Sequence, residues 1–376
     1  MRNIIDKITN LIISIILIGV IFVVITLLFN VYQFLNLKEV PVGADALGST
    51  IDSGQIAEKE AANPGKEAIA ADTQNPYASS ESENRTVPAA NESGFYYKQL
   101  DEYAKILYDE IKKNENQFKT GQINIDFGTR FNTLLNQPSG DTILNNAYQE
   151  AFNTFLIDTP GVFYIDITKI YLMIKSTTRG STTTYEVSIN NKENETCYNA
   201  EFGSSEQVAS AIAKIEEIEN SIISEAKGNT YEKVKYVHDW LVDHVEYDRS
   251  LSKANTYNIY GTLVERQVVC EGYARTLKHI LDRMNIPCII VVGEATNSEG
   301  KTESHAWNYV QIDNKWYGID VTWDDPIIIG GGTLTNNLKY RYFLKGTEVF
   351  ERHVASGKLL EGGKQYTYPV LNSGDF

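Results

Sequence analysis

The stretch 268-VVCEGYARTLKHIL-281 places a cysteine directly before a run of residues that predicts a helix. Apolar residues recur along this run at three- and four-residue steps, as on the buried face of a helix. A cysteine nucleophile reacts as the thiolate, and the free N–H groups and the dipole of a helix N-terminus favour that anion. Gly272 permits close approach of the backbone. We therefore predict that Cys270 is a nucleophile at a helix start.

A cysteine nucleophile also needs a base, and the chain has five histidines. His279 lies nine residues after Cys270, which turns it by about 900° to the opposite side of the helix, so it is predicted to point away. His238 and His244 lack the i, i+4 spacing of a helical metal pair and are interpreted as packing or surface residues. His353 belongs to no pattern that indicates a role.

The fifth histidine lies on a predicted hairpin, in which SHAWNYVQI and KWYGIDVTW form two strands over 304–323. If Ile312 pairs with Lys315, counting back makes His305 and Asp320 diagonal neighbours on one face, with backbones about 7–8 Å apart. A carboxylate beside an imidazole fixes its tautomer and stabilises the imidazolium. We therefore predict that His305 is the base and that Asp320 orients it.

An oxyanion formed during amide chemistry needs hydrogen-bond donors, and the backbone N–H of Cys270 is the first candidate. Tyr260 and Gln267 are candidates for a second donor, and plain packing or surface exposure is the alternative for each. Trp307, on the predicted face that carries His305, is a further candidate for donation or substrate binding. The segment DDP, 324–326, lacks the ligand spacing of a calcium loop, so no metal or cofactor is expected.

The composition indicates a chain that can bury a hydrophobic core but is unsuited to binding nucleic acid. Of 376 residues, 42% are hydrophobic and 22% charged, and the net charge is −15, which phosphates would repel. Three cysteines are too few for a disulfide framework or a zinc site. We predict that Cys288 lies in the core and that Cys197 is a loop residue.

The N-terminus carries LIISIILIGVIFVVITLLF, residues 11–29, a run without charge. At about 1.5 Å per helical residue, this run nearly spans a hydrocarbon core of about 30 Å. Arg2 and Lys7 precede it, which favours an outward-facing remainder. A cleaved signal peptide is the alternative, but the small-x-small sequence at 44–46 lies far beyond the apolar run. We predict an uncleaved transmembrane anchor.

Composition and periodicity divide the chain into four parts. Residues 1–37 are the cytoplasmic tip and anchor, and 38–93, rich in Ala, Ser, Glu, Asn, Pro and Gly, are a disordered stalk. Residues 94–229 are predicted to form an α+β domain, and 230–376 the catalytic domain. The predicted elements before 230 are helices over 96–113, 141–155 and 205–226, the last with Glu216, Glu217 and Glu219 exposed, and strands over 162–176 and 181–190.

The segments VVCEGYA, HAWNYV and WYGIDVTWDDP, in this order, resemble the transglutaminase-like superfamily, especially its bacterial cell-surface members. The resemblance covers roughly 230–345. It implies a papain-like α+β core with the cysteine helix packed on an antiparallel sheet. It also places the family's catalytic triad on Cys270, His305 and Asp320. Where the family often has a glycine shortly before the cysteine, this chain has Glu-Arg-Gln at 265–267.

The expected function is that of a membrane-anchored, extracellular cysteine enzyme acting on amide bonds of proteins or peptides. Its acyl-enzyme would be resolved by water, as in a protease or amidase, or by an amine, as in a transglutaminase. Cell-wall-associated proteins are among the candidate substrates. A catalytically inactive surface-binding module on the same fold is the alternative, and a structural spacer is a third interpretation.

Overall fold

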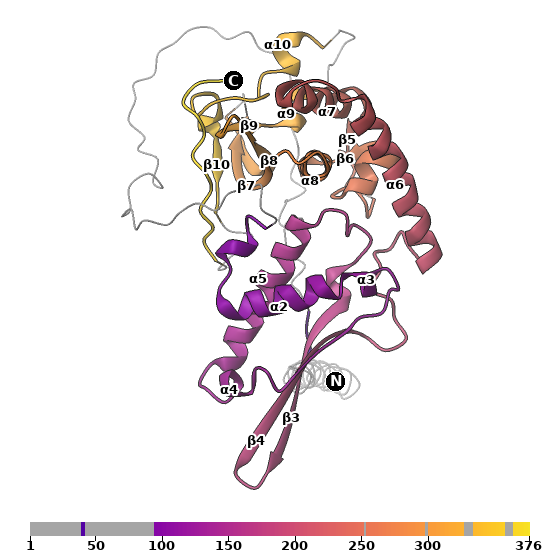
Figure 1. The fold of residues 1–376 in the computed structure, drawn as a ribbon, viewed down its shortest axis with the longest axis vertical. Coiled ribbons are helices and arrows are strands. Elements are labelled where there is room, and N and C mark those ends of the chain that lie inside the picture. Colours follow the sequence, from indigo (N-terminus) through magenta and orange to yellow (C-terminus); the bar gives the residue numbers. More distant parts are fainter. Residues whose placement is uncertain (1–38, 42–93, 252, 298–299, 327–333, 358–363) are drawn as a thin grey trace, which may run out of the picture.

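The computed structural model describes residues 39–41 and 94–376, with gaps at 252, 298–299, 327–333 and 358–363. The chain forms two lobes, with the earlier part of the sequence in the lower lobe of Figure 1 and the later part in the upper. The predicted anchor and residues 42–93 of the predicted stalk lie outside the described residues. Within the described part, none of the helices has the length and apolarity needed to cross a membrane.

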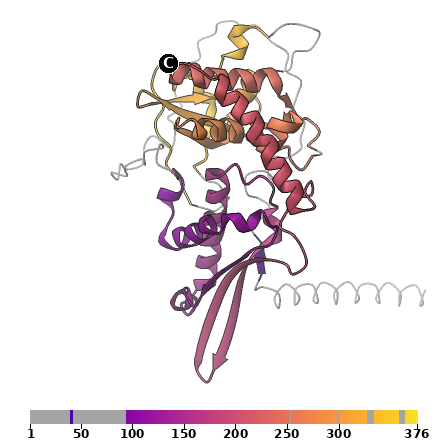
Figure 2. The same ribbon diagram turned by 45° about the vertical axis from the view of Figure 1, so that its right-hand side comes forward.

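The first lobe packs two helices against a twisted antiparallel sheet with strand order β1-β3-β4-β2. The strands β3 and β4 continue as a long hairpin that projects away from both lobes (Figure 1 and Figure 2). The elements of this lobe are β1 (Glu39–Pro41), η1 (Tyr97–Gln99), α2 (Glu102–Lys113), α3 (Glu115–Phe118), β2 (Asn124–Gly128), α4 (Asn132–Leu135), α5 (Gly140–Asp158), η2 (Ile167–Lys169), β3 (Ile170–Arg179) and β4 (Thr182–Asn191).

Two predicted boundaries in this lobe are wrong. The first helix begins at Glu102 rather than near residue 96, because the Asp101 side chain accepts the N–H of Ala104 and caps the helix there. The first long strand begins at Ile170 rather than at residue 162, because the 3-10 turn η2 precedes it.

Helices α6 (Ser205–Glu225) and α7 (Thr230–His244) lead into the second lobe. The prediction that Glu219 is solvent-exposed is wrong, since only 1% of it is exposed. Its carboxylate lies 2.8 Å from His279 Nε2 and 2.5 Å from Arg283 Nη1, so it pairs α6 with the helix that follows Cys270. His279 therefore points away from the cysteine end of that helix, as predicted.

The second lobe is built on an antiparallel sheet with strand order β10-β7-β8-β9. Ile312 lies opposite Lys315, so the predicted hairpin register is confirmed. The second strand stops at Ile319 rather than continuing to residue 323, because the Asp320 side chain accepts the N–H of Trp323 and starts a helix. The strands are β7 (Cys288–Thr296), β8 (Thr302–Ile312), β9 (Lys315–Ile319) and β10 (His353–Ala355).

Helix α8 (Cys270–Arg283) packs on β7 and β8, which confirms the predicted α+β core with the cysteine helix against an antiparallel sheet. A Cβ on Gly272 would lie 2.5 Å from the Val268 side chain, so this position requires glycine. Arg266, in the segment before the cysteine where the family often has a glycine, adopts the left-handed conformation that glycine favours, with φ of 61°. The other elements of this lobe are β5 (Glu246–Tyr247), η3 (Gly261–Glu265), β6 (Gln267–Val268), α9 (Val321–Asp324), α10 (Asn336–Lys339) and η4 (Val349–Arg352).

The buried apolar residues of the two lobes form one continuous core. Polar contacts also cross the junction, because Arg275 Nη1 donates to the carbonyl of Leu156 at 2.8 Å and the Tyr366 hydroxyl donates to Glu150 at 2.8 Å. The first lobe therefore supports α8 directly.

Candidate active site

Cys270 is the first residue of α8 and is buried. The start of the helix is anchored on both sides, since the N–H of Val269 donates to the carbonyl of Thr256 at 3.0 Å and the Thr262 hydroxyl donates to the carbonyl of Gly272 at 3.0 Å. The predicted placement of Cys270 at a helix N-terminus is confirmed.

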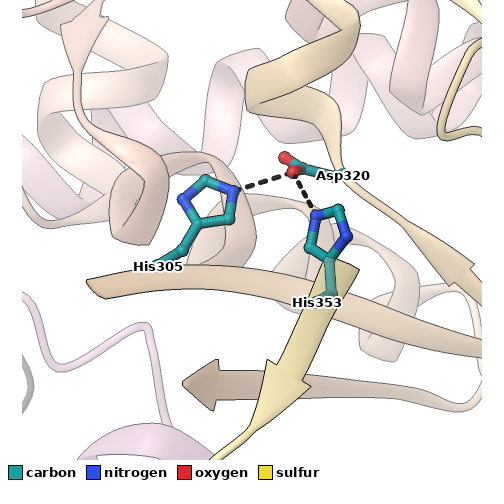
Figure 3. Close-up of side chains that lie close together, drawn as sticks. All are labelled: His305, Asp320 and His353. Atoms are coloured by element: carbon teal, nitrogen blue, oxygen red, sulfur yellow. Dashed lines mark hydrogen bonds and ion pairs between the residues drawn. The ribbon is translucent and has the colours of Figure 1, made fainter. Parts of the chain in front are cut away.

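His305 and Asp320 meet in the interior of the second lobe (Figure 3). The Nε2 atom of His305, on β8, lies 2.7 Å from Oδ2 of Asp320, which caps α9. Burial lowers the pKa of His305, but the charge and hydrogen bond of Asp320, together with a hydrogen bond to Cys270, outweigh burial and raise this pKa to about 10. His305 is thus held as an imidazolium between a carboxylate and the thiol of Cys270.

Asp320 is in turn held as a carboxylate. Burial raises the pKa of Asp320, but the charge of His305 and the hydrogen bonds of His305 and His353 outweigh burial and bring it well below its usual range. The structure therefore brings His305 and Asp320 together as predicted, and Cys270 is among the groups that raise the pKa of His305. Their roles in a reaction remain a prediction.

Sequence reasoning missed His353. Its Nε2 atom lies 3.0 Å from Oδ2 of Asp320, the same oxygen that His305 contacts (Figure 3). It belongs to β10, a strand of only three residues, and lies opposite Ala295 of β7. Such a short strand carries no periodicity, so nothing in the local sequence indicates this placement.

Among the described residues, His305, Asp320 and His353 are the group that could hold a metal ion, with one ligand atom from each within 4.8 Å of the others. However, both histidine nitrogens approach the same carboxylate oxygen, at 2.7 and 3.0 Å. These are hydrogen-bond distances, and they account for the arrangement through hydrogen bonding alone.

The three further candidates from the sequence lie in different surroundings. Tyr260 stacks on Phe163 of the first lobe, with ring centroids 5.7 Å apart. Gln267 is half-buried in β6. Trp307 is buried and stacks on His305 at 6.1 Å. Their roles as oxyanion donors or substrate contacts remain predictions.

Two tyrosines that the sequence did not single out lie close to the cysteine. Burial, followed by the charge of Cys270, raises the pKa of Tyr247 well above its usual value. Burial, followed by the charges of Glu271 and Cys270, also raises the pKa of Tyr257.

The acidic neighbour of the cysteine is compensated. Glu271 is buried, and its Oε1 atom lies 2.6 Å from Nε of Arg275, one turn further along α8. Burial raises the pKa of Glu271, and the Arg275 cation opposes that rise. The pairing reduces the repulsion that this carboxylate would exert on a thiolate at Cys270.

The other two cysteines are both buried. Cys288 lies in the core, as predicted, and burial raises its pKa far above the usual value. Cys197 was predicted to be a loop residue and lies outside any strand or helix, but burial raises its pKa to about 12. Its backbone bonds to Gly121 and Asp166, at 3.0 and 2.8 Å, hold this segment in the interior.

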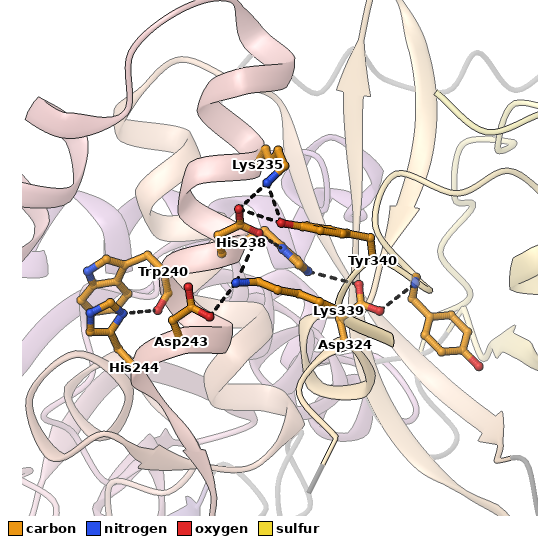
Figure 4. A network of polar contacts seen from close by, with 10 residues as sticks. Lys235, His238, Trp240, Asp243, His244, Asp324, Lys339 and Tyr340 are labelled. Atoms are coloured by element: carbon orange, nitrogen blue, oxygen red, sulfur yellow. Dashed lines mark hydrogen bonds and ion pairs between the residues drawn. The ribbon is translucent and has the colours of Figure 1, made fainter. Parts of the chain in front are cut away.

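A second polar network joins α7 to α9 (Figure 4). The Nε2 atom of His238 lies 3.1 Å from Oδ2 of Asp324, and its Nδ1 atom lies 3.1 Å from Oδ1 of Asp239. The other oxygen of Asp324 accepts the N–H of Tyr342 at 2.7 Å. The predicted packing residue His238 thus connects α7 to the helix that Asp320 caps, whereas His244 stacks on Trp240 at the surface.

The charge on His238 leads to a testable pH dependence. Burial lowers its pKa, but Asp239 and Asp324 outweigh burial and raise it. A raised pKa gives stability that is complete below the usual value and is lost as the pH rises through the folded value. We expect wild-type stability to be lower at alkaline pH than at about pH 6, and this part of the fall to be absent in His238→Gln, which has no titrating ring. Denaturant unfolding at both pH values measures the free energy of unfolding of each protein. An equal loss of stability in the wild type and in His238→Gln would contradict a charged His238.

The Transglutaminase-like superfamily model matches residues 216–321. Kyphoscoliosis peptidase from Homo sapiens and its counterpart from Mus musculus are each 23% identical to the chain over 138 residues, which are 34% of this chain. The match spans only 20% of the length of those relatives.

Two solved structures show local similarity. A crystal structure of a TGase shares 17% identity over 46% of this chain and 50% of its own, with a TM-score of 0.28. The periplasmic domain of TgpA from Pseudomonas aeruginosa shares 17% identity over 37% of this chain and 55% of its own, with a TM-score of 0.23. The family model matches the segment that carries Cys270, His305 and Asp320, so this part of the chain is similar to the transglutaminase-like superfamily.

Proposed function

We propose that the chain is a cysteine enzyme that cleaves or exchanges amide bonds of proteins or peptides through an acyl-enzyme. The observation that carries this proposal is the buried 2.7 Å bond between His305 and Asp320, in the lobe whose helix α8 begins at Cys270. Cys270 is also among the groups that raise the pKa of His305. Each group has a role in the proposed mechanism: Cys270 is the nucleophile, His305 transfers the proton, and Asp320 orients and stabilises the imidazolium.

The proposed steps balance without a further reactant. The Cys270 thiolate attacks the amide carbonyl carbon, the C–N bond breaks, and the His305 imidazolium gives its proton to the departing nitrogen. Water or an amine then attacks the thioester and gives its proton to His305, which restores the thiolate–imidazolium pair. Water gives hydrolysis, and an amine gives transamidation.

The negative oxygen formed in each step needs donors. The backbone N–H of Cys270 is one candidate. Tyr260 and Gln267 remain candidates from the sequence.

The experiment that tests the function uses a glutamine-bearing protein, a labelled primary amine and mass spectrometry. Amine incorporation supports transamidation, deamidation or backbone cleavage supports hydrolysis, and Cys270→Ser provides the control for each product. Products that persist in Cys270→Ser come from a contaminant. A wild-type protein that gives no product and has an unreactive Cys270 would favour the alternative, a surface-binding module on the same fold.

We also propose that residues 11–29 anchor the chain in the membrane with the two lobes outside the cell. The charge-free run and the basic residues before it support this proposal. Protease added to intact cells is expected to release the lobes by cutting within residues 38–93. Lobes that stay protected until the cells are lysed would contradict the outward orientation.

A further inference from the structure

The Asp320 carboxylate receives three hydrogen bonds from three different elements. Oδ2 accepts from His305 of β8 at 2.7 Å and from His353 of β10 at 3.0 Å (Figure 3). Oδ1 accepts the N–H of Trp323 in α9 at 3.1 Å. Because both oxygens are bonded from different sides, the carboxylate cannot rotate without breaking at least one bond.

The hydrogen bond from His353 has a defined direction. Its Nδ1 atom is buried and has no hydrogen-bond partner among the described residues, so a proton there would be unsatisfied. The ring therefore carries its proton on Nε2, where Asp320 accepts it. A second cation would also face the His305 imidazolium, and burial and the charge of His305 together lower the pKa of His353 despite Asp320.

The surroundings of His353 hold its ring in place. Four aromatic rings pack against it, with ring centroids 4.4 Å away for Phe350, 4.6 Å for Trp323, 5.0 Å for Trp307 and 5.4 Å for Tyr342. Gly318 makes this packing possible, because a Cβ there would lie 2.5 Å from the Phe350 ring. The exposed fraction of the His353 side chain is 0%.

We propose that His353 is a positioning residue, whose neutral ring donates from Nε2 to fix the carboxylate that orients His305. The inference rests on the proposed function and goes beyond it by adding a fourth member to the catalytic group. His353 acts only through Asp320. A neutral donor suits this role, since it holds the carboxylate without contributing a charge that would compete with His305.

The test compares His353→Phe, which keeps an aromatic ring but has no donor, with His353→Gln, whose side-chain amide can donate from a similar place. The readouts are the rate of Cys270 alkylation by iodoacetamide and, with a glutamine-bearing protein as substrate, kcat and KM. We expect His353→Phe to lower the alkylation rate and kcat by roughly 10- to 100-fold with KM unchanged, and His353→Gln to recover most of the loss.

A matched control separates donation from packing. Phe350→Leu removes the closest ring against His353 but no bond to Asp320, so we expect a lower melting temperature with an alkylation rate near that of wild type. Proton NMR of the wild type adds a test that needs no variant: two strongly deshielded imidazole N–H resonances are expected, one from each histidine bonded to Asp320.

The outcomes separate this inference from the proposed function. A wild-type rate in His353→Phe, equal losses in the Phe and Gln variants, or a single deshielded resonance would overturn the role of His353 while leaving the triad intact. If Cys270 in the wild type is not alkylated in preference to the other cysteines, and His305→Ala makes no difference, then the proposed function itself fails.

Discussion

Asp320→Asn is expected to lower turnover about 10⁴-fold while leaving the fold intact, the size of effect seen when an orienting carboxylate is neutralised. Asp320 is the largest influence that raises the pKa of His305, so its charge keeps the imidazolium available as the proton donor. Asparagine has the same shape but no charge. The pKa of His305 should therefore fall toward the value that burial alone would give.

The hydrogen bonds of Asp320 explain why an asparagine amide cannot replace its carboxylate. Oδ2 accepts from both histidines, and Oδ1 accepts the N–H of Trp323. An asparagine has only one oxygen, so its NH₂ group must face either the two histidine donors or the cap of α9. In each orientation a donor meets a donor, and at least one buried N–H loses its acceptor.

Asp325→Asn is a matched control, because it makes the same substitution directly after α9. Its Oδ2 accepts from the Tyr273 hydroxyl at 2.7 Å, and an amide oxygen can do the same. We expect wild-type turnover in this variant. Turnover is measured with a glutamine-bearing protein, and circular dichroism and thermal unfolding check the fold. Near-normal turnover in Asp320→Asn would make Asp320 a structural residue and remove it from the triad.

The parts of the site that the sequence predicts are those that depend on local patterns. The run after Cys270 has helical periodicity, and the two-residue loop between Ile312 and Lys315 sets the hairpin register. The start of the helix and the pairing of the hairpin can therefore be predicted from the sequence. Asp313 and Asn314 adopt the left-handed conformation, with φ of 51° and 61°, which a two-residue hairpin loop requires. The diagonal relation of His305 and Asp320 follows from that register.

The parts that the sequence did not predict depend on contacts between distant segments. His353 reaches Asp320 because β10 pairs with β7, and a three-residue strand has no pattern that identifies its partner. Glu219 looks like part of a charged helix surface, but a cation on another helix turns it inward. Cys197 is buried by tertiary hydrogen bonds rather than by an apolar sequence around it.

The reactivity of Cys270 separates an enzyme from a binding module most directly. We expect a limiting amount of iodoacetamide at about pH 6 to modify Cys270 first. Iodoacetamide reacts with thiolates, and burial keeps both other cysteines protonated at this pH. Burial raises the pKa of Cys197 to about 12 and that of Cys288 further. For Cys197 the thiolate fraction at that pH is about one in a million.

His305 is expected to control the labelling rate. Its raised pKa, about 10, keeps the ring charged through neutral pH, and its hydrogen bond to Cys270 places that charge beside the sulfur. His305→Ala removes the cation, so we expect labelling to slow by roughly tenfold or more. His279→Ala is the matched control, because this histidine lies on α8 but pairs with Glu219, away from the cysteine end.

Peptide mapping of the native protein after partial alkylation gives the order in which the cysteines are labelled. Loss of activity in the same samples shows whether the modified cysteine is required for catalysis. The difference in rate between the wild type and His305→Ala should persist through neutral pH and should disappear as the pH rises through about 10, because His305 then loses its proton. Two outcomes would contradict a catalytic Cys270: modification of Cys197 first, or reaction of Cys270 only in alkali at a rate that His305→Ala does not change. Either result would favour a binding module in which Cys270 is simply a buried residue at the start of α8.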